Sequence, residues 1–163
     1  MFDLLQAISS ADFERARELF TEYGEGLPIE DRTFQDFDGE VAGLETMYTP
    51  PCGVLVLAQA DGALGGCVAL RHLEPGICEM KRLYVRPGVR KSGLGRILAV
   101  RIVEEARRLG YQRMRLDTLR TMTAAQALYE TMGFRRIEPY NDTPVVGMVF
   151  MELNLIDNGE RQK

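Results

Sequence analysis

The sequence predicts an α/β (α+β) fold in which one mixed, mostly antiparallel sheet of about seven strands is flanked by about four helices. The chain of 163 residues has the length of one domain with a single core. The spacing of its apolar residues alternates between the patterns of strands and helices, in the order strand, two helices, three strands, helix, strand, helix, two strands. We expect one domain over residues 1–157 and a flexible polar tail over residues 158–163.

The N-terminal part reads as a short strand followed by two amphipathic helices. Phe2–Ala7 is mostly apolar and predicts an edge strand. Ser9 and Asp12 have the spacing of a capping box, and Gly24 is a stop signal, so we expect the first helix between them. Helical spacing then recurs in two sets of apolar residues: Phe13, Ala16, Leu19, Phe20 and Tyr23, and Phe34, Phe37, Val41 and Leu44.

The remainder alternates between strand and helix patterns. Turn residues at Asp61-Gly62 and Pro75-Gly76 separate three β-rich runs, which predict an antiparallel meander. A long helix over Leu94–Leu109 and a shorter one over Thr123–Met132 both end at a glycine. The expected strands are Val54–Ala60, Ala63–Leu73, Ile77–Val85, Tyr111–Asp117, Phe134–Tyr140 and Val145–Leu155, the last two paired around Asn141-Asp142.

Composition narrows the class of protein. The N-terminus has no basic region ahead of an apolar run, and no stretch has the length of a membrane span, so we expect a cytoplasmic protein with no membrane partner. The three cysteines lack paired spacing and are expected to be reduced, and His72 is the single histidine, so no metal site is predicted. Residues 1–60 hold 12 acids and 3 bases, whereas the rest of the chain is basic on balance.

One glycine-rich segment carries the strongest chemical signal. Residues 85–96 place a turn between a predicted strand and a predicted helix, where backbone N–H groups and the helix dipole favour an anion. Gly93 and Gly95 leave room for close approach, and Arg90, Lys91 and Arg96 supply positive charge. A pyrophosphate fits this cradle. The spacing lacks the Gly-Lys-Ser/Thr of a P-loop and the third small residue of a dinucleotide fingerprint.

The segment resembles the pyrophosphate loop of the GNAT superfamily of acyl-CoA-dependent N-acyltransferases. Arg90-x-x-Gly93-x-Gly95 is similar to the family's Arg/Gln-x-x-Gly-x-Gly/Ala motif. Downstream of the strand end Leu116-Asp117-Thr118, the run Ala125-x-x-Leu128-Tyr129-Glu130-x-x-Gly133-Phe134 is similar to its Ala-x-x-Leu-Tyr-x-x-x-Gly-Phe segment. The resemblance covers about residues 53–155. Met122 stands where many members have an asparagine that makes a polar contact near the pantetheine arm of the cofactor. This departure affects that one contact and not the pyrophosphate loop.

The resemblance implies an N-acetyltransferase that uses acetyl-CoA as co-substrate. It implies a splayed pair of parallel strands whose free backbone amides hold the pantetheine and the thioester oxygen. By position these amides belong to Leu83, Tyr84 and Val85. The residues implied in binding the pyrophosphate are Arg90, Lys91, Ser92, Gly93, Leu94, Gly95 and Arg96.

Two side chains are predicted to carry the proton transfers. Glu79 occupies the position from which some family members draw a general base, and an apolar cleft formed with Ile77, Leu83 and Val85 would raise its pKa. The alternative is a strand glutamate paired with Lys81 or Arg71. Tyr129 occupies the position of the acid that protonates the departing thiolate. The alternative is a tyrosine that only packs at the end of its helix.

The acceptor is expected to be the primary amine of a small molecule, whose identity is left open. The resemblance implies an acceptor site walled by residues 27–49 and 139–144. Five acids in the first wall favour a cationic amine: Glu30, Asp31, Asp36, Asp38 and Glu40. A non-catalytic acyl-CoA-binding or sensor module and a protein N-terminal or lysine acetyltransferase are alternatives. We expect no nucleic-acid partner, and a homodimer is left open.

Overall fold

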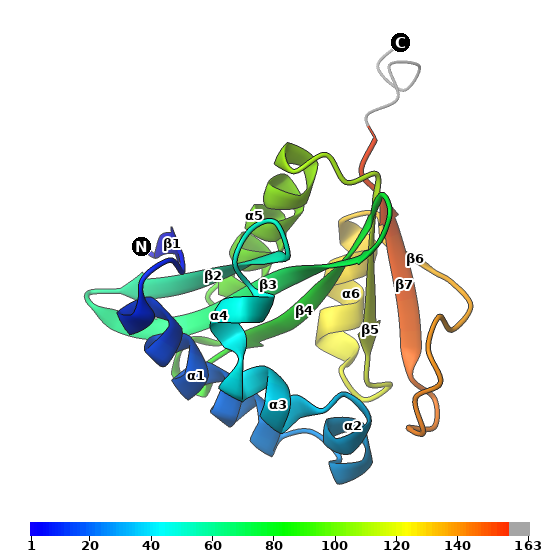
Figure 1. The fold of residues 1–163 in the computed structure, drawn as a ribbon, viewed down its shortest axis with the longest axis horizontal. Coiled ribbons are helices and arrows are strands. Elements are labelled where there is room, and N and C mark those ends of the chain that lie inside the picture. Colours follow the sequence, from blue (N-terminus) through cyan, green and yellow to red (C-terminus); the bar gives the residue numbers. More distant parts are fainter. Residues whose placement is uncertain (157–163) are drawn as a thin grey trace.

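The computed structural model describes residues 1–156, which form one seven-stranded sheet with helices on both faces (Figure 1). The order of strands across the sheet is β1-β2-β3-β4-β5-β7-β6. The strands are β1 (Asp3–Gln6), β2 (Gly53–Ala60), β3 (Ala63–Glu74), β4 (Ile77–Val85), β5 (Arg113–Thr118), β6 (Arg135–Arg136) and β7 (Val149–Asn154). All neighbours are antiparallel except β4 and β5. The prediction of a mixed, mostly antiparallel sheet of seven strands is confirmed.

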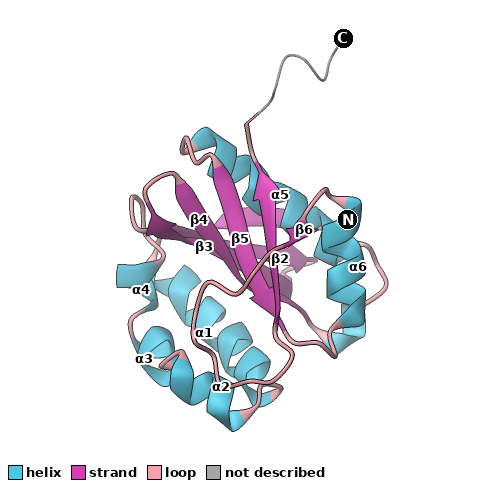
Figure 2. Ribbon diagram, turned by 90° about the vertical axis from the view of Figure 1, so that its right-hand side faces the viewer, coloured by secondary structure: helices cyan, strands magenta, loops and turns pink. Residues whose placement is uncertain are grey.

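The helices form two layers with the sheet between them (Figure 2). One layer consists of α1 (Ser10–Glu25), α2 (Ile29–Phe34), α3 (Phe37–Ala42) and α4 (Leu44–Met47). The other consists of α5 (Leu94–Arg108) and α6 (Thr123–Thr131). Each layer buries its own apolar cluster against the sheet, because alternate strand residues point to opposite faces. In β2, Val54 and Val56 pack toward α5, and Leu55 and Leu57 pack toward α1.

The parallel strands β4 and β5 separate soon after they meet. They pair only over Ile77–Glu79 and Arg113–Arg115, although β5 pairs with β7 along its whole length. On its other side β4 changes register with β3, and Arg82 has a φ of 61°. The backbone of β4 beyond Glu79 has no paired strand on its β5 side.

The start of α1 follows the predicted chemistry. Ser9 Oγ accepts a hydrogen bond from the Asp12 N–H, and the Asp12 carboxylate accepts one from the Ser9 N–H. These two bonds satisfy backbone groups that have no partner within the helix. The capping box is confirmed, and the helix ends at Glu25, one residue beyond the predicted stop.

The second predicted helix is wrong as a single element. The segment forms three short helices, α2 to α4, so the described chain has six α-helices where about four were expected. The breaks have local causes. Asp36 has a φ of 51°, which interrupts the helical path between α2 and α3, and Gly43 stands between α3 and α4. A 3-10 turn, η1 (Pro87–Val89), also precedes α5.

The final pair of strands is shorter than predicted. The Phe134–Tyr140 strand reduces to β6, and the Val145–Leu155 strand reduces to β7. The connecting segment contains prolines at 139 and 144, which cannot donate to a ladder. Its polar side chains instead cross to β4 and β5: Tyr140 contacts Glu79, and Asn141 contacts Asp117. The predicted tail, residues 158–163, lies outside the described residues.

None of the helices in residues 1–156 combines the length and the apolar character needed to cross a bilayer.

Candidate functional site

The predicted anion cradle is a turn that presents free backbone amides. Gly93 precedes α5 with a φ of 88°, a conformation that glycine adopts without strain. The first hydrogen bond of the helix runs from the Ile97 N–H to the Gly93 carbonyl at 3.1 Å. The N–H groups of Gly95 and Arg96 therefore have no carbonyl within the helix and point out of its N-terminus. Such a terminus attracts a phosphate.

Basic side chains surround the cradle. Arg90 donates from Nε to the Val85 carbonyl at 3.0 Å, which fixes its stem while the rest of the side chain stays exposed. Arg96 donates from Nη1 to Thr131 Oγ1 at 2.9 Å. Lys91 is exposed on the same turn with a φ of 68°. These three cations surround the free amides, as a polyanionic ligand requires.

A groove of about 600 Å³ begins at this cradle and follows the free edge of β4. Among the predicted binding residues, the groove is lined by Leu83, Tyr84, Val85, Arg90 and Gly95. The others, Lys91, Ser92, Gly93, Leu94 and Arg96, belong to the turn and the start of the helix and do not line the groove. Leu94 is 1% exposed, so its side chain anchors the helix in the core and only its backbone can serve a ligand.

The groove also contains residues that sequence reasoning missed. Glu22, Tyr23 and Gly26 line it from α1 and its end. The helical spacing of α1 indicated Tyr23 only as a core residue, because spacing does not tell which sheet edge a helix crosses. Met122, which stands where many members of the resembled family have asparagine, also lines the groove.

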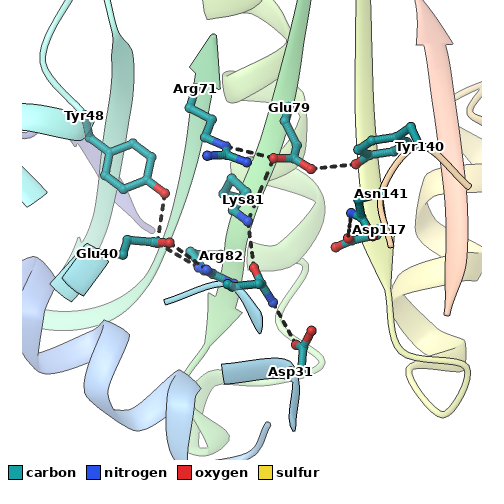
Figure 3. Close-up of polar contacts among 11 residues, drawn as sticks. Asp31, Glu40, Tyr48, Arg71, Glu79, Lys81, Arg82, Asp117, Tyr140 and Asn141 are labelled. Carbon is teal, nitrogen blue, oxygen red and sulfur yellow. Dashed lines mark hydrogen bonds and ion pairs between the residues drawn. The ribbon is translucent and has the colours of Figure 1, made fainter. Parts of the chain in front are cut away.

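A second, smaller cavity lies next to the groove along β4 (Figure 3). It has a volume of about 330 Å³ and opens between β4 and β5, under α2 and α3. Its lining includes Gln35, Glu40, Arg71, Glu79, Lys81, Asp117 and Asn141. Glu79 and Lys81 of β4 face this cavity, whereas Leu83 and Val85 face the groove. The irregularity at Arg82 lies between the two.

Glu79 is buried at the top of the small cavity and is held on both carboxylate oxygens (Figure 3). Oε1 accepts from Arg71 Nε at 2.9 Å and lies 3.8 Å from Lys81 Nζ, and Oε2 accepts from the Tyr140 hydroxyl at 2.6 Å. Burial raises the pKa of Glu79, but the charges of Lys81 and Arg71 and the hydrogen bond from Tyr140 lower it by more. The pKa of Glu79 therefore lies below its usual value. The expectation of a raised pKa is wrong because the neighbours are cations rather than Ile77, Leu83 and Val85.

Asp117 faces the same cavity from β5 and was not singled out by sequence reasoning as a titrating group. It is half-buried and accepts one hydrogen bond, from Asn141 Nδ2 at 3.1 Å. Burial raises the pKa of Asp117, and the charge of Lys81 offsets this only in part. Its position at the end of a strand was the one sequence signal available. A carboxyl with a raised pKa in a cleft has the character of a catalytic base.

Tyr129 lies in the core between α6 and the sheet. Its ring packs 5.6 Å from that of Phe134, and the residue lines neither cavity. Every described side-chain nitrogen or oxygen that is closed off from solvent has a hydrogen-bond partner. The Tyr129 hydroxyl has none among residues 1–156, so its oxygen meets open space although its ring is buried. Burial raises the pKa of Tyr129, which keeps the phenol protonated.

The acidic wall predicted from residues 27–49 does not give the cavity a negative character. Of its five acids only Glu40 lines the small cavity. Arg82 donates to both oxygens of Glu40, from Nε at 2.8 Å and from Nη2 at 2.6 Å. The structure does not gather these acids in the small cavity, and the one acid that lines it is paired with a buried arginine, so they give no support there to a cationic acceptor.

Comparisons with known proteins identify the family to which the chain is similar. The family described as "Acetyltransferase (GNAT) family" matches residues 12–134. An uncharacterized N-acetyltransferase of Schizosaccharomyces pombe is 40% identical over 146 residues, which are 88% of this chain and 89% of that protein. The N-acetylaspartate synthetase of Danio rerio is 32% identical over 111 residues, which are 67% of this chain and 39% of that protein.

Solved structures share the fold. An acetyltransferase of the GNAT family from Staphylococcus aureus superimposes with a TM-score of 0.76 at 19% identity, over 96% of this chain and 100% of that one. The PaiA N-acetyltransferase from Thermoplasma acidophilum, solved in complex with coenzyme A, gives a TM-score of 0.71 at 19% identity, over 94% of this chain and 99% of that one.

Gly95 provides a direct test of the groove. A Cβ at this position meets Leu128 and Val85 at 3.9 Å, an ordinary contact distance, so a side chain there fills the groove without displacing backbone. We expect Gly95→Leu to weaken CoA binding at least tenfold, about 1.4 kcal/mol, in titration calorimetry. Gly88→Ala, in the preceding turn with open space around its Cβ, is the control and should bind normally. Unchanged CoA affinity in Gly95→Leu would show that the cradle is assigned to the wrong place.

Proposed function

The chain belongs to the GNAT family of acetyltransferases, and on that premise we propose that it transfers the acetyl group of acetyl-CoA to the primary amine of a small molecule. The observation that carries the proposal is the order of sites along β4. The groove with its anion cradle is followed along β4 by a small cavity that contains the carboxylates of Glu79 and Asp117 besides that of Glu40, which Arg82 neutralises. A thioester and an amine can approach each other only where two such sites adjoin.

The residues of the cradle fit CoA. The free amides of Gly95 and Arg96, with Arg90 and Lys91 beside them, would hold the pyrophosphate. The unpaired edge of β4 at Leu83, Tyr84 and Val85 would hold the pantetheine amides and the carbonyl oxygen of the thioester. Backbone donors fixed in this way stabilise negative charge that develops on that oxygen. Bound acetyl-CoA supplies an activated acyl group.

The amine is proposed to attack the acetyl carbon directly. Its nitrogen forms the new C–N bond, the C–S bond breaks, one proton leaves the nitrogen, and the departing sulfur takes up a proton. No acyl-enzyme is needed, and the three cysteines support this: none of them lines the groove or the small cavity. Burial raises the pKa of the Cys78 thiol to about 12, which suppresses the thiolate that a nucleophile requires.

Two carboxylates compete for the role of base. Glu79 was predicted from its position, but both of its oxygens are engaged and its pKa is lowered. Asp117 has one hydrogen bond and a raised pKa, so it retains a lone pair and more affinity for a proton. We therefore favour Asp117 as the base, with Glu79 holding Arg71 and Lys81 in place.

Tyr129 is proposed as the acid. A phenol that stays protonated and whose oxygen is not closed off from solvent can donate to a thiolate. The supporting observation is that burial has spared this one polar atom. Packing against Phe134 would by itself give no reason for a hydroxyl without a partner.

A relative whose name describes the synthesis of a small N-acetylated compound supports a small-molecule acceptor. The proposal predicts that acetyl-CoA and a panel of amino acids, polyamines and amino sugars give amine-dependent release of CoA thiol, which the Gly95→Leu variant loses. CoA binding without release for any amine would instead establish a non-catalytic binding module. Release with peptides alone would establish a protein acetyltransferase.

The pair of carboxylates can be separated by their pH profiles. A base works when ionised, so the rate falls as the pH falls through its pKa. If Asp117 is the base, the acidic limb of kcat lies above the usual range of a carboxyl, and Asp117→Asn removes it and lowers kcat about 10²-fold or more. Glu79→Gln should keep the limb, as should the exposed control Glu130→Gln. Loss of the limb in Glu79→Gln, with Asp117→Asn normal, would assign the base to Glu79.

Tyr129→Phe tests the acid. The ring and its packing remain, so we expect unchanged thermal stability and CoA affinity and a loss of about 10²-fold or more in kcat. The deficit should shrink with acetyl donors whose thiols have lower pKa values, because a better leaving group needs less help. Tyr111→Phe removes a hydroxyl that bonds His72 outside both cavities and is the matched control. Normal turnover by Tyr129→Phe would place this tyrosine in the core alone.

A further inference from the structure

The wall of the small cavity formed by β3 and β4 carries an uncompensated positive charge. Arg71 and Lys81 share one carboxylate, that of Glu79, at 2.9 Å and 3.8 Å. The third cation of the region, Arg82, is matched one to one by Glu40. The cluster of Arg71, Glu79 and Lys81 therefore keeps one positive charge more than its internal partners neutralise.

Both cations also have hydrogen-bond donors to spare. Among residues 1–156, Arg71 uses only Nε, which leaves both Nη groups without a protein partner. Lys81 donates to Gln35 Oε1 at 2.8 Å, and its 3.8 Å contact with Glu79 is too long for a hydrogen bond. Lys81 is only 8% exposed, and burial lowers its pKa. A buried ammonium with unused donors is costly unless an anion completes it.

The opposite wall has the reverse character. Asp117 on β5 is a carboxyl with a single donor, Asn141, and it interacts across the cavity with Lys81. A ligand that spans the cavity thus meets free cationic donors on one side and a proton acceptor on the other (Figure 3). The volume of about 330 Å³ is at the lower end of the range for ligand sites. The cavity therefore suits one small molecule that carries both an anionic group and an amine.

We propose that the acceptor is a free amino acid, whose carboxylate binds to Arg71 and Lys81 while its amine faces Asp117. This inference rests on the proposed acetyl transfer and specifies its substrate class. Charge pairing with the carboxylate fixes the direction of the molecule, because Arg71 binds a carboxylate with two parallel donors. Polyamines and amino sugars lack the anion, and they leave the spare donors of Lys81 and Arg71 unused.

The experiment compares each of the common L-amino acids with its amide and with the corresponding decarboxylated amine, using wild-type protein and acetyl-CoA. We expect at least one amino acid to be acetylated with a kcat/KM about 10²-fold or more above its amide, since a buried site built for a polar group rejects a ligand that lacks it. Equal rates for acid and amide, or turnover restricted to amines without a carboxylate, would overturn the inference and leave the proposed acetyl transfer standing. No release of CoA with any amine would count against the proposed function itself.

Variants of Arg71 and Lys81 test whether these two cations cause the preference for an amino acid over its amide. Lys81→Met and Arg71→Met keep the stems of the side chains, and we expect each to lower the ratio of kcat/KM for the amino acid to kcat/KM for its amide at least tenfold. CoA affinity and the melting temperature confirm the fold of each variant. Arg113→Met, an exposed arginine of β5 outside the cavity, is the control. If both cavity variants keep the acid-to-amide ratio of the wild type, the carboxylate binds elsewhere and the inference is wrong.

Discussion

The buried ion pair of Arg82 and Glu40 fixes the geometry on which both cavities depend. Arg82 has a φ of 61°, and a non-glycine residue keeps this conformation only where its surroundings compensate the strain. The compensation is extensive: two hydrogen bonds to Glu40, a third bond to that carboxylate from Tyr48, and the rings of Tyr23 and Phe37 at 5.6 Å and 4.9 Å. Glu40 belongs to α3, so the pair ties the helical layer to β4 at the point where β4 leaves β5.

The turn at Arg82 also divides the work of β4. Before it, Glu79 and Lys81 present charged side chains to the small cavity; after it, Leu83 and Val85 offer backbone and apolar surface to the groove. In a regular strand the alternation of side chains would continue unbroken. Here Lys81 reaches Gln35 and the adjacent Arg82 reaches Glu40, so two successive residues contact the same helical layer. A single irregularity thus separates the groove from the small cavity, the sites proposed for the acyl donor and for the amine, along one strand.

The sequence predicted the elements that short-range patterns encode, and it failed where long-range contacts decide. Periodicity gave β2 to β5, α1, α5 and α6 to within a few residues, and the glycine motif located the cradle, because both signals are local. The helix across residues 34–44 was mispredicted because apolar spacing says nothing of Asp36, whose backbone leaves the helical region. The expected pKa of Glu79 failed for a related reason: Lys81 lies two residues away on the same strand, but Arg71 and Tyr140 arrive from β3 and from the segment before β7. Asp117 lies in the strand-end segment 116–118, and only the fold shows that it faces Lys81.

Charge counted along the chain misjudged the site, and the contacts explain why. The acid-rich first sixty residues suggested a negative wall, yet Glu40 is paired with Arg82. Asp31 accepts a hydrogen bond from the amide of Gln35, whose oxygen accepts one from Lys81. Local character is set by the charges that remain unmatched after burial. Desolvation raises the pKa of Asp117 and lowers that of Lys81, so one cause weakens both ions. A ligand that brings a carboxylate to Lys81 and an ammonium to Asp117 restores both partners. In the proposed reaction Asp117, the group that receives the ammonium, would also take its proton, so recognition and activation of the acceptor would use the same carboxylate.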